Sequence, residues 1–252
     1  MMLWHCVILV FRLIKTTDLF TMKWMALFVF LVACSVPESH KYDIGTEYVG
    51  VPYVADPLGE EMPPDTDPLM RVDAFDCTTF VETAVAGGDV EKLTRIRYKN
   101  GNIGFSARNH FIETDWLANN ADFVTDVTAQ YGKTAVRHVV IDKQNWFKVV
   151  HNIDSDVPIQ TVDLNYIPYE SLGHITTSEP LIVLFIDDKS KISDKIGTDL
   201  AVKHMGFLLP NGTFRHASSQ YGRVMDVDFD EYVARRASGT NALGIMLVKI
   251  ND

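Results

Sequence analysis

Cysteine is scarce in this sequence: the 252 residues contain only three. Cys6 and Cys34 stand near the N-terminus, which leaves Cys77 as the one thiol in the rest of the chain. A single unpaired cysteine excludes a disulfide framework in that region and is a candidate reactive group. The other interpretation is a buried cysteine that acts as a small hydrophobic residue. The neighbours of Cys77 have to decide between the two.

The chain also has little positive charge and no long hydrophobic run. Lys and Arg number 23 against 33 Asp and Glu, so the formal net charge is −10. Such a chain offers no broad basic face to phosphates, and we expect no nucleic-acid partner. The apolar run 24–33 has ten residues, well short of the roughly 20 that a membrane-spanning helix needs. Low-complexity tracts and regular repeats are absent, so one globular domain accounts for most of the length.

The N-terminal segment has the pattern of a secretory leader. The stretch MKWMALFVFLVACS places a lysine before the apolar run and a small residue before Cys34. It resembles the lipobox of bacterial lipoproteins, in which the cysteine is acylated and becomes the first mature residue. We therefore expect translation to start at Met22 and a lipid on Cys34 to anchor the protein to a membrane. The residues before Met22 are either untranslated or an extended leader. In such lipoproteins an Asp after the lipid-bearing cysteine retains the protein in the inner membrane. Because Ser35 stands at that position, we expect the anchor to lie in the outer membrane, with the protein facing the periplasm.

The rest of the chain divides into a tether and one folded domain. We expect 1–34 to be the leader, 35–46 a polar tether and 47–252 the domain. Within the domain, helical spacing of apolar residues and β-branched runs mark the elements. The expected helices are 73–89, 89–98 and 229–239, and the expected strands include 180–188, a hairpin over 204–218, and 244–250. Helices that precede a run of strands favour the α+β class with an antiparallel sheet.

The stretch KHMGFLLPNGTFRHASS, residues 203–219, carries a turn signal between two short strands. Proline at the second position of LPNG fits a type I turn, and its glycine then adopts a left-handed conformation in a three-residue loop with a bulge. That loop pairs Leu209 with Thr213. His204 and His216 then lie on one face, as diagonal neighbours about 7–8 Å apart at Cα. A two-residue Asn-Gly turn would shift the pairing and put the histidines on opposite faces.

Cys77 stands where the first expected helix begins, directly after an aspartate that can cap it. The free N–H groups and positive potential of a helix start lower the pKa of a thiol, which suits a nucleophile. Cys77 would attack a carbonyl, and its backbone N–H would help to stabilise the oxyanion. His204 would accept and return the proton, and His216 would hold the tautomer of His204.

The same three residues could instead be zinc ligands. No fourth ligand stands at a characteristic spacing, and the H-E-x-x-H pattern is missing. We therefore expect no metal and no cofactor.

Several motifs carry a specific family resemblance. FDCTTFVE, around Cys77, is similar to the nucleophile motif of the papain-like NlpC/P60 superfamily, normally F-D-C-S-G followed by a hydrophobic residue. HMGFLLPNGTFRHAS is similar to that superfamily's histidine hairpin, and YVGVPYVADPLGE to the segment ahead of the nucleophile. The threonine pair after the cysteine, SARNHFIETDW and TDLAVKHMGF resemble a narrower branch, the DUF1460 family, described as N-acetylmuramoyl-L-alanine amidase-like. The resemblance covers residues 44–250.

The resemblance implies a papain-like fold, with the nucleophile at the N-terminus of a helix packed on an antiparallel sheet. It implies a cysteine hydrolase that cuts an amide bond in peptidoglycan or muropeptides, in the first place the bond between N-acetylmuramic acid and L-Ala. The catalytic residues that it implies are Cys77, His204 and His216. The residues that we expect to contact substrate are Tyr53, Asp76, Arg108, Asn109 and His110.

Each expected substrate contact also has a structural interpretation. Arg108 could hold a carboxylate of the stem peptide or form an ion pair within the protein. Asn109 and His110 could stabilise a loop through hydrogen bonds. Asp76 could be only the helix cap, and Tyr53 could be only a packing residue.

Three other functions are compatible with the sequence. They are a stem-peptide endopeptidase of the D-Glu–diaminopimelate type, a non-catalytic muropeptide-binding lipoprotein, and acyl transfer through the same thioester. The segment between Tyr53 and Cys77 is longer and more acidic than in small NlpC/P60 domains, so the bond cleaved depends on a pocket that the motifs do not describe. A module that only binds would not need Cys77 and both histidines, which favours an enzyme.

Overall fold

The computed structural model describes residues 43–251. The expected leader, the lipid site at Cys34 and residues 35–42 of the tether lie outside these residues. No helix within 43–251 is both long and apolar enough to cross a membrane.

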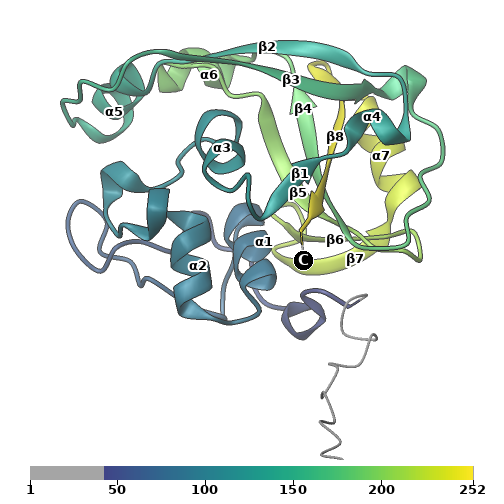
Figure 1. The fold of residues 1–252 in the computed structure, drawn as a ribbon, viewed down its shortest axis with the longest axis horizontal. Coiled ribbons are helices and arrows are strands. Elements are labelled where there is room, and N and C mark those ends of the chain that lie inside the picture. The colour runs from purple at the N-terminus through teal and green to yellow at the C-terminus, as the bar shows by residue number, and fades with distance from the viewer. Residues whose placement is uncertain (1–42, 252) are drawn as a thin grey trace, which may run out of the picture. The chain divides into compact units, whose positions relative to one another are not determined.

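The described chain alternates short helices with strands after an N-terminal region that is mainly helical (Figure 1). The α-helices are α1 (Cys77–Ala86), α2 (Val90–Arg97), α3 (Leu117–Asn119), α4 (Thr128–Tyr131), α5 (Lys143–His151), α6 (Lys191–Ile196) and α7 (Phe229–Ala237). Short 3-10 helices are η2 (Thr46–Tyr48), η3 (Lys99–Gly101), η4 (Phe105–Ala107) and η6 (Tyr169–Ser171), and η5 (Ile112–Trp116) is a π-helix. The strands are β1 (Val124–Asp126), β2 (Ala135–Ile141), β3 (Gln160–Pro168), β4 (Leu181–Asp187), β5 (Val202–Leu208), β6 (Thr213–Ser218), β7 (Arg223–Asp228) and β8 (Ala242–Ile250).

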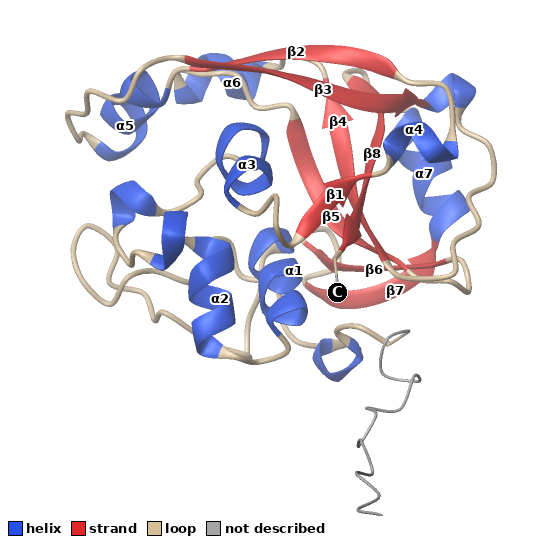
Figure 2. Cartoon of the chain, viewed as in Figure 1, coloured by secondary structure: helices blue, strands red, loops and turns tan. Residues whose placement is uncertain are grey.

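The strands form one antiparallel sheet in the order β2-β3-β8-β4-β5-β6-β7, with β1 paired to β8 (Figure 2). Strands β4 to β7 are neighbours in both sequence and sheet, whereas β8 returns from the end of the chain to lie between β3 and β4. The expected α+β class with an antiparallel sheet is confirmed.

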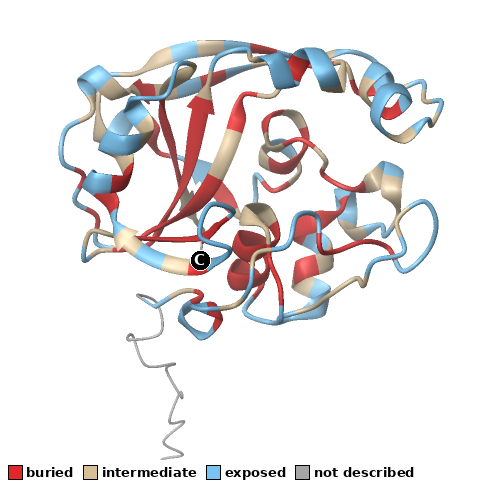
Figure 3. Ribbon diagram, turned by 180° about the vertical axis from the view of Figure 1, so that it is seen from behind, coloured by how far each residue is buried: buried red, intermediate tan, exposed pale blue. Residues whose placement is uncertain are grey.

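Both faces of the central strands are covered. Alternate residues of β4 enter two separate hydrophobic clusters, and its first six residues are all buried (Figure 3). On one face, Phe80 of α1 packs edge-on against Phe207 of β5 at 5.6 Å between ring centroids. On the other face, Tyr232 of α7 packs against Phe185 of β4 at 5.3 Å. Helices α1 and α7 therefore contribute side chains to opposite faces of the central strands.

Within the stretch 73–89, the first expected helix begins directly after the predicted cap. Asp76 is its N-cap, because its carboxylate accepts from the Thr79 N–H at 2.7 Å and the Thr79 side chain bonds back to the Asp76 N–H. Gly87, at φ 64°, ends the helix in the left-handed conformation. Residues 73–76 therefore lie outside the helix, and Cys77 is its first residue.

Candidate active site

The N-terminus of α1 brings Cys77 to the strands that carry the histidines. Helix α1 packs against β5 and β6 of the sheet and against α2 (Figure 1). The main chain of Met205 hydrogen-bonds to the Cys77 thiol. The thiol therefore lies against the residue that follows His204 in β5.

The hairpin between β5 and β6 has the predicted loop. The Leu209 N–H donates to the Thr213 carbonyl at 2.8 Å, and Gly212 has φ 81°. In the ladder between β5 and β6, Phe207 lies opposite Arg215 and Leu208 lies opposite Phe214. This is the register expected from the LPNG turn, and the prediction of the loop is confirmed.

The register places the two histidines on one face, where they form a hydrogen bond. Nε2 of His204 is 2.8 Å from Nδ1 of His216. The His216 ring stacks on Phe214 at 4.8 Å, and Tyr232 packs against both histidine rings. His216 is only 2 % exposed, so its ring has little freedom to move. Within residues 43–251, Nδ1 of His204 has no hydrogen-bond partner, so it can face a reacting group.

Gly206 allows the two strands to approach closely at the histidine pair. A Cβ atom on Gly206 would lie 2.7 Å from the Arg215 carbonyl oxygen and 2.8 Å from the His216 Cβ. Both distances are too short for a side chain. The absence of a side chain at this position therefore permits the approach of His216 to β5.

Burial, and not the helix start, dominates the charge state of Cys77. Although the residue keeps some exposure, burial raises the pKa of its thiol to about 12, and the Asp76 carboxylate adds to the increase. Hydrogen bonds from the Met205 main chain and the Thr78 side chain oppose the increase but do not cancel it. The expected lowering of the thiol pKa by the helix start is therefore outweighed, because desolvation disfavours the thiolate more than local dipoles stabilise it.

The histidines are also neutral at physiological pH. Burial, followed by the charge of His216, lowers the pKa of His204 well below its usual 6.5. Burial likewise lowers the pKa of His216 to about 4. The resting site therefore combines a neutral thiol with neutral imidazoles, and no hydrogen bond joins Cys77 to a histidine in the described residues.

Tyr53 and Asp76, two of the expected substrate contacts, lie near the thiol. Burial raises the pKa of Tyr53 to about 12, and the charges of Cys77 and Asp76 add to the increase, so the phenol lies within electrostatic range of both. Asp76 also accepts from the Asp56 N–H at 3.3 Å, in addition to capping α1. The carboxylate of Asp76 is therefore occupied by structural hydrogen bonds, and substrate contact by either residue stays a prediction.

The buried guanidinium of Arg108 lies among three carboxylates. Its guanidinium binds Glu60 through two hydrogen bonds of 2.7 Å and Asp65 at 2.5 Å, with Asp56 at 3.5 Å. The side chain of Arg108 is 7 % exposed and that of Glu60 is fully buried. These contacts support the ion-pair interpretation, and nothing in this geometry presents the guanidinium to a stem peptide.

Asn109 and His110 are held by main-chain carbonyls. The Asn109 amide donates to the Ile96 carbonyl at 2.9 Å, and Nε2 of His110 is 2.6 Å from the Phe105 carbonyl oxygen. Burial lowers the pKa of His110 to about 3, so its ring is neutral. The loop-stabilising interpretation accounts for both residues, and their contact with substrate has no support in these hydrogen bonds.

Two residues of the site were not identified from the sequence. Tyr232 covers both histidines, and burial raises the pKa of its phenol to about 12. Glu113 accepts hydrogen bonds from the Ala201 and Val202 N–H groups at 2.7 Å each, which fixes the start of β5 before His204. Tyr232 lies in the expected helix 229–239, and Glu113 lies in the motif SARNHFIETDW. The residues next to them in sequence do not indicate that Tyr232 contacts the histidines or that Glu113 binds the start of β5.

A metal centre has no candidate in the part of the chain that the structure describes. Across residues 43–251, no three or more His, Cys, Asp or Glu side chains are arranged to hold a metal ion. The zinc alternative therefore has no geometric support.

Comparisons with known proteins agree on a family. The model of the AmiA-like family, described as N-acetylmuramoyl-L-alanine amidase-like, matches residues 43–240. A solved structure from Legionella pneumophila, assigned to the DUF1460 family, is 25% identical, with a TM-score of 0.76, and the match covers 85% of this chain and 89% of that one. Comparison with the curated proteins gave no match.

Two Bacteroides structures share the fold. An N-acetylmuramoyl-L-alanine amidase from Bacteroides uniformis is 21% identical, with a TM-score of 0.67, over 85% of this chain and 98% of that one. A protein from Bacteroides fragilis described as a putative xylanase is 22% identical, with a TM-score of 0.62, over 82% of this chain and all of that one. Because the family model spans most of the described residues, the chain belongs to the N-acetylmuramoyl-L-alanine amidase-like family.

Proposed function

We propose that this protein is a cysteine amidase that hydrolyses the bond between N-acetylmuramic acid and L-Ala in peptidoglycan or muropeptides. The observation that carries the proposal is the hydrogen bond between Nε2 of His204 and Nδ1 of His216, beside a thiol that lies against Met205. This arrangement leaves Nδ1 of His204 as the base. The family match supports the substrate class, and the motifs around Cys77 and the histidines support a papain-like fold of the NlpC/P60 type.

The first half of the reaction forms a thioester. The Cys77 sulfur attacks the carbonyl carbon of the muramic acid lactyl group while the thiol proton passes to Nδ1 of His204. Proton transfer accompanies attack because burial disfavours a free thiolate. The backbone N–H of Cys77 stabilises the developing oxyanion. His204 then gives the proton to the nitrogen of L-Ala as the C–N bond breaks.

The second half releases the sugar. Water attacks the thioester carbonyl and gives a proton to Nδ1 of His204, which returns it to the Cys77 sulfur as the C–S bond breaks. Nδ1 can accept a proton only when Nε2 carries the other hydrogen. His216 accepts that hydrogen at Nδ1, so it fixes the required tautomer and stabilises the imidazolium in each step.

We further propose that the enzyme acts in the cell envelope, held to the outer membrane by a lipid on Cys34 and facing the periplasm. The support is the leader pattern that ends at Cys34. An anchor of this kind places the enzyme beside its insoluble substrate without a separate wall-binding module.

The test is mass spectrometry of products from purified muropeptides incubated with the chain that starts at residue 35. Cys77→Ala serves as the matched control, with circular dichroism to check its fold. Free stem peptide plus intact sugar, from the wild type alone, would establish the amidase. Shortened stems would move the cut to a bond within the peptide, and a product joined to an added amine would indicate acyl transfer. Tight binding without any product would favour the non-catalytic alternative.

A further inference from the structure

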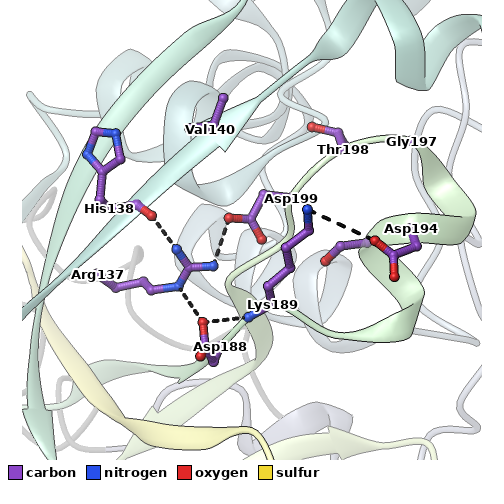
Figure 4. A pocket seen from close by; sticks show the side chains of 10 residues that line it. Arg137, His138, Val140, Asp188, Lys189, Asp194, Gly197, Thr198 and Asp199 are labelled. Carbon is purple, nitrogen blue, oxygen red and sulfur yellow. Dashed lines mark hydrogen bonds and ion pairs between the residues drawn. The ribbon is translucent and has the colours of Figure 1, made fainter.

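A cavity of about 640 Å³ lies away from Cys77, between β2 and the segment that joins β4 to β5 through α6. Most of the residues that line it have polar or charged side chains (Figure 4). The proposed reaction uses none of these side chains.

One cation in this cavity is fixed in place. Arg137 is held by Asp199 at 2.7 Å and by Asp188 at 3.5 Å, and it also donates to the carbonyl of His138 (Figure 4). Its side chain is 14 % exposed. Arg137 therefore stabilises the cavity wall and leaves little of its own charge to a ligand, since even its buried Nε faces Asp188 at 3.5 Å.

Three other charged side chains in the cavity are exposed to solvent, and each makes only a long ion pair, of 3.5 Å or 4.0 Å. The side chain of Asp188 is 62 % exposed, and those of Lys189 and Asp194 are 65 % and 74 % exposed. Lys189 and Asp194 are 4.0 Å apart, which is at the limit of an ion pair. The cavity thus offers solvent-exposed carboxylates and an exposed ammonium side by side.

A buried polar atom without a partner also belongs to the lining. Ser193 is 2 % exposed, and its Oγ has no hydrogen-bond partner in the part of the chain described. A buried hydroxyl without a partner has lost its hydration without compensation. A polar ligand that reached Ser193 would restore a hydrogen bond.

The cavity lies within reach of a stem peptide held at the catalytic residues. Asp199 precedes His204 by five residues, so their Cα atoms are at most about 18 Å apart. Three extended residues span about 10–11 Å, and a long side chain on the third adds to that reach. The start of β5 between the two sites is fixed by Glu113, so the spacing is rigid.

We propose that this cavity binds the end of the third stem residue when that end carries both an ammonium and a carboxylate, as the far end of diaminopimelate does. The ligand carboxylate would meet Lys189, and its ammonium would meet Asp188 and Asp194. A ligand with a single charge could replace only one of the two long ion pairs, Arg137–Asp188 and Lys189–Asp194. The substrate class in this proposal rests on the proposed amidase function.

The experiment is calorimetric titration of the Cys77→Ala protein with L-Ala-γ-D-Glu-meso-diaminopimelate. The comparison peptide, L-Ala-γ-D-Glu-L-Lys, has the ammonium but lacks the distal carboxylate. We expect the diaminopimelate peptide to bind about tenfold more tightly, since a charge-assisted hydrogen bond is lost with the carboxylate. Asp188→Asn and Lys189→Gln should each weaken its binding about tenfold. Lys148→Gln, which changes another exposed lysine paired with an aspartate, should have no effect.

The outcomes separate this proposal from the proposed function. Equal affinity for the two peptides, no saturable binding, or unchanged affinity in both Asp188→Asn and Lys189→Gln would overturn the cavity proposal. Cleavage of muropeptides by the wild type would leave the amidase assignment standing in each of those cases. Discriminating binding by Cys77→Ala without any cleavage by the wild type would overturn the amidase assignment and leave the cavity proposal intact.

Discussion

Replacement of His216 by leucine would remove the one side-chain acceptor that Nε2 of His204 has among the described residues. In the proposed reaction this hydrogen bond joins a charged imidazolium to a neutral acceptor. Bonds of that kind contribute about 1.5–3 kcal/mol, and each 1.36 kcal/mol changes a rate tenfold. We therefore expect His216→Leu to lower kcat about 10- to 150-fold, with a smaller change in KM because substrate need not touch His216.

His216→Asn is the matched control, because asparagine has the shape of leucine and keeps an acceptor. Both variants lose the stacking of the His216 ring on Phe214, so the difference between them isolates the hydrogen bond. The assay measures kcat and KM on a purified muropeptide, with thermal unfolding to confirm that both variants fold. If the folded leucine and asparagine variants had the same kcat, the positioning role of His216 would be refuted.

Three further predictions concern the surroundings of the site. Arg108→Met should lower the free energy of unfolding in urea by about 3–5 kcal/mol, because it leaves Glu60 buried without its cation; a loss under 1 kcal/mol would contradict this. Gly206→Ala should reduce both kcat and Tm, since its Cβ would collide with β6, whereas Gly104→Ala, where nothing lies within 4 Å, should change neither. His110 binds fewer protons folded than unfolded between its folded pKa of about 3 and its usual 6.5, so stability falls as pH drops through that range. His110→Phe should reduce this slope by up to about 1.4 kcal/mol per pH unit, and an unchanged slope would show that the ring is not buried neutral.

Sequence reasoning identified the parts of the site that depend on close neighbours. The LPNG turn predicted the loop between β5 and β6, and with it the common face of His204 and His216. Asp76 was recognised as the cap that makes Cys77 the first residue of a helix. Turn types and helix caps are decided by backbone dihedral preferences and hydrogen bonds within a few residues, so they are readable from the sequence alone.

Only the tertiary structure decided the protonation state of Cys77 and the ion-pair partner of Arg108. A helix start predicts a lowered thiol pKa, but the packing of β5 against Cys77, more than a hundred residues later in the chain, buries the thiol and raises its pKa to about 12. Arg108 is a candidate for substrate binding on sequence grounds, but in the fold its guanidinium forms two hydrogen bonds with Glu60, which comes from a separate loop. The sequence by itself determined the turn between the histidine strands and the cap that precedes Cys77. Desolvation and ion pairing depend on every atom around a group, and those atoms are brought together only by the fold.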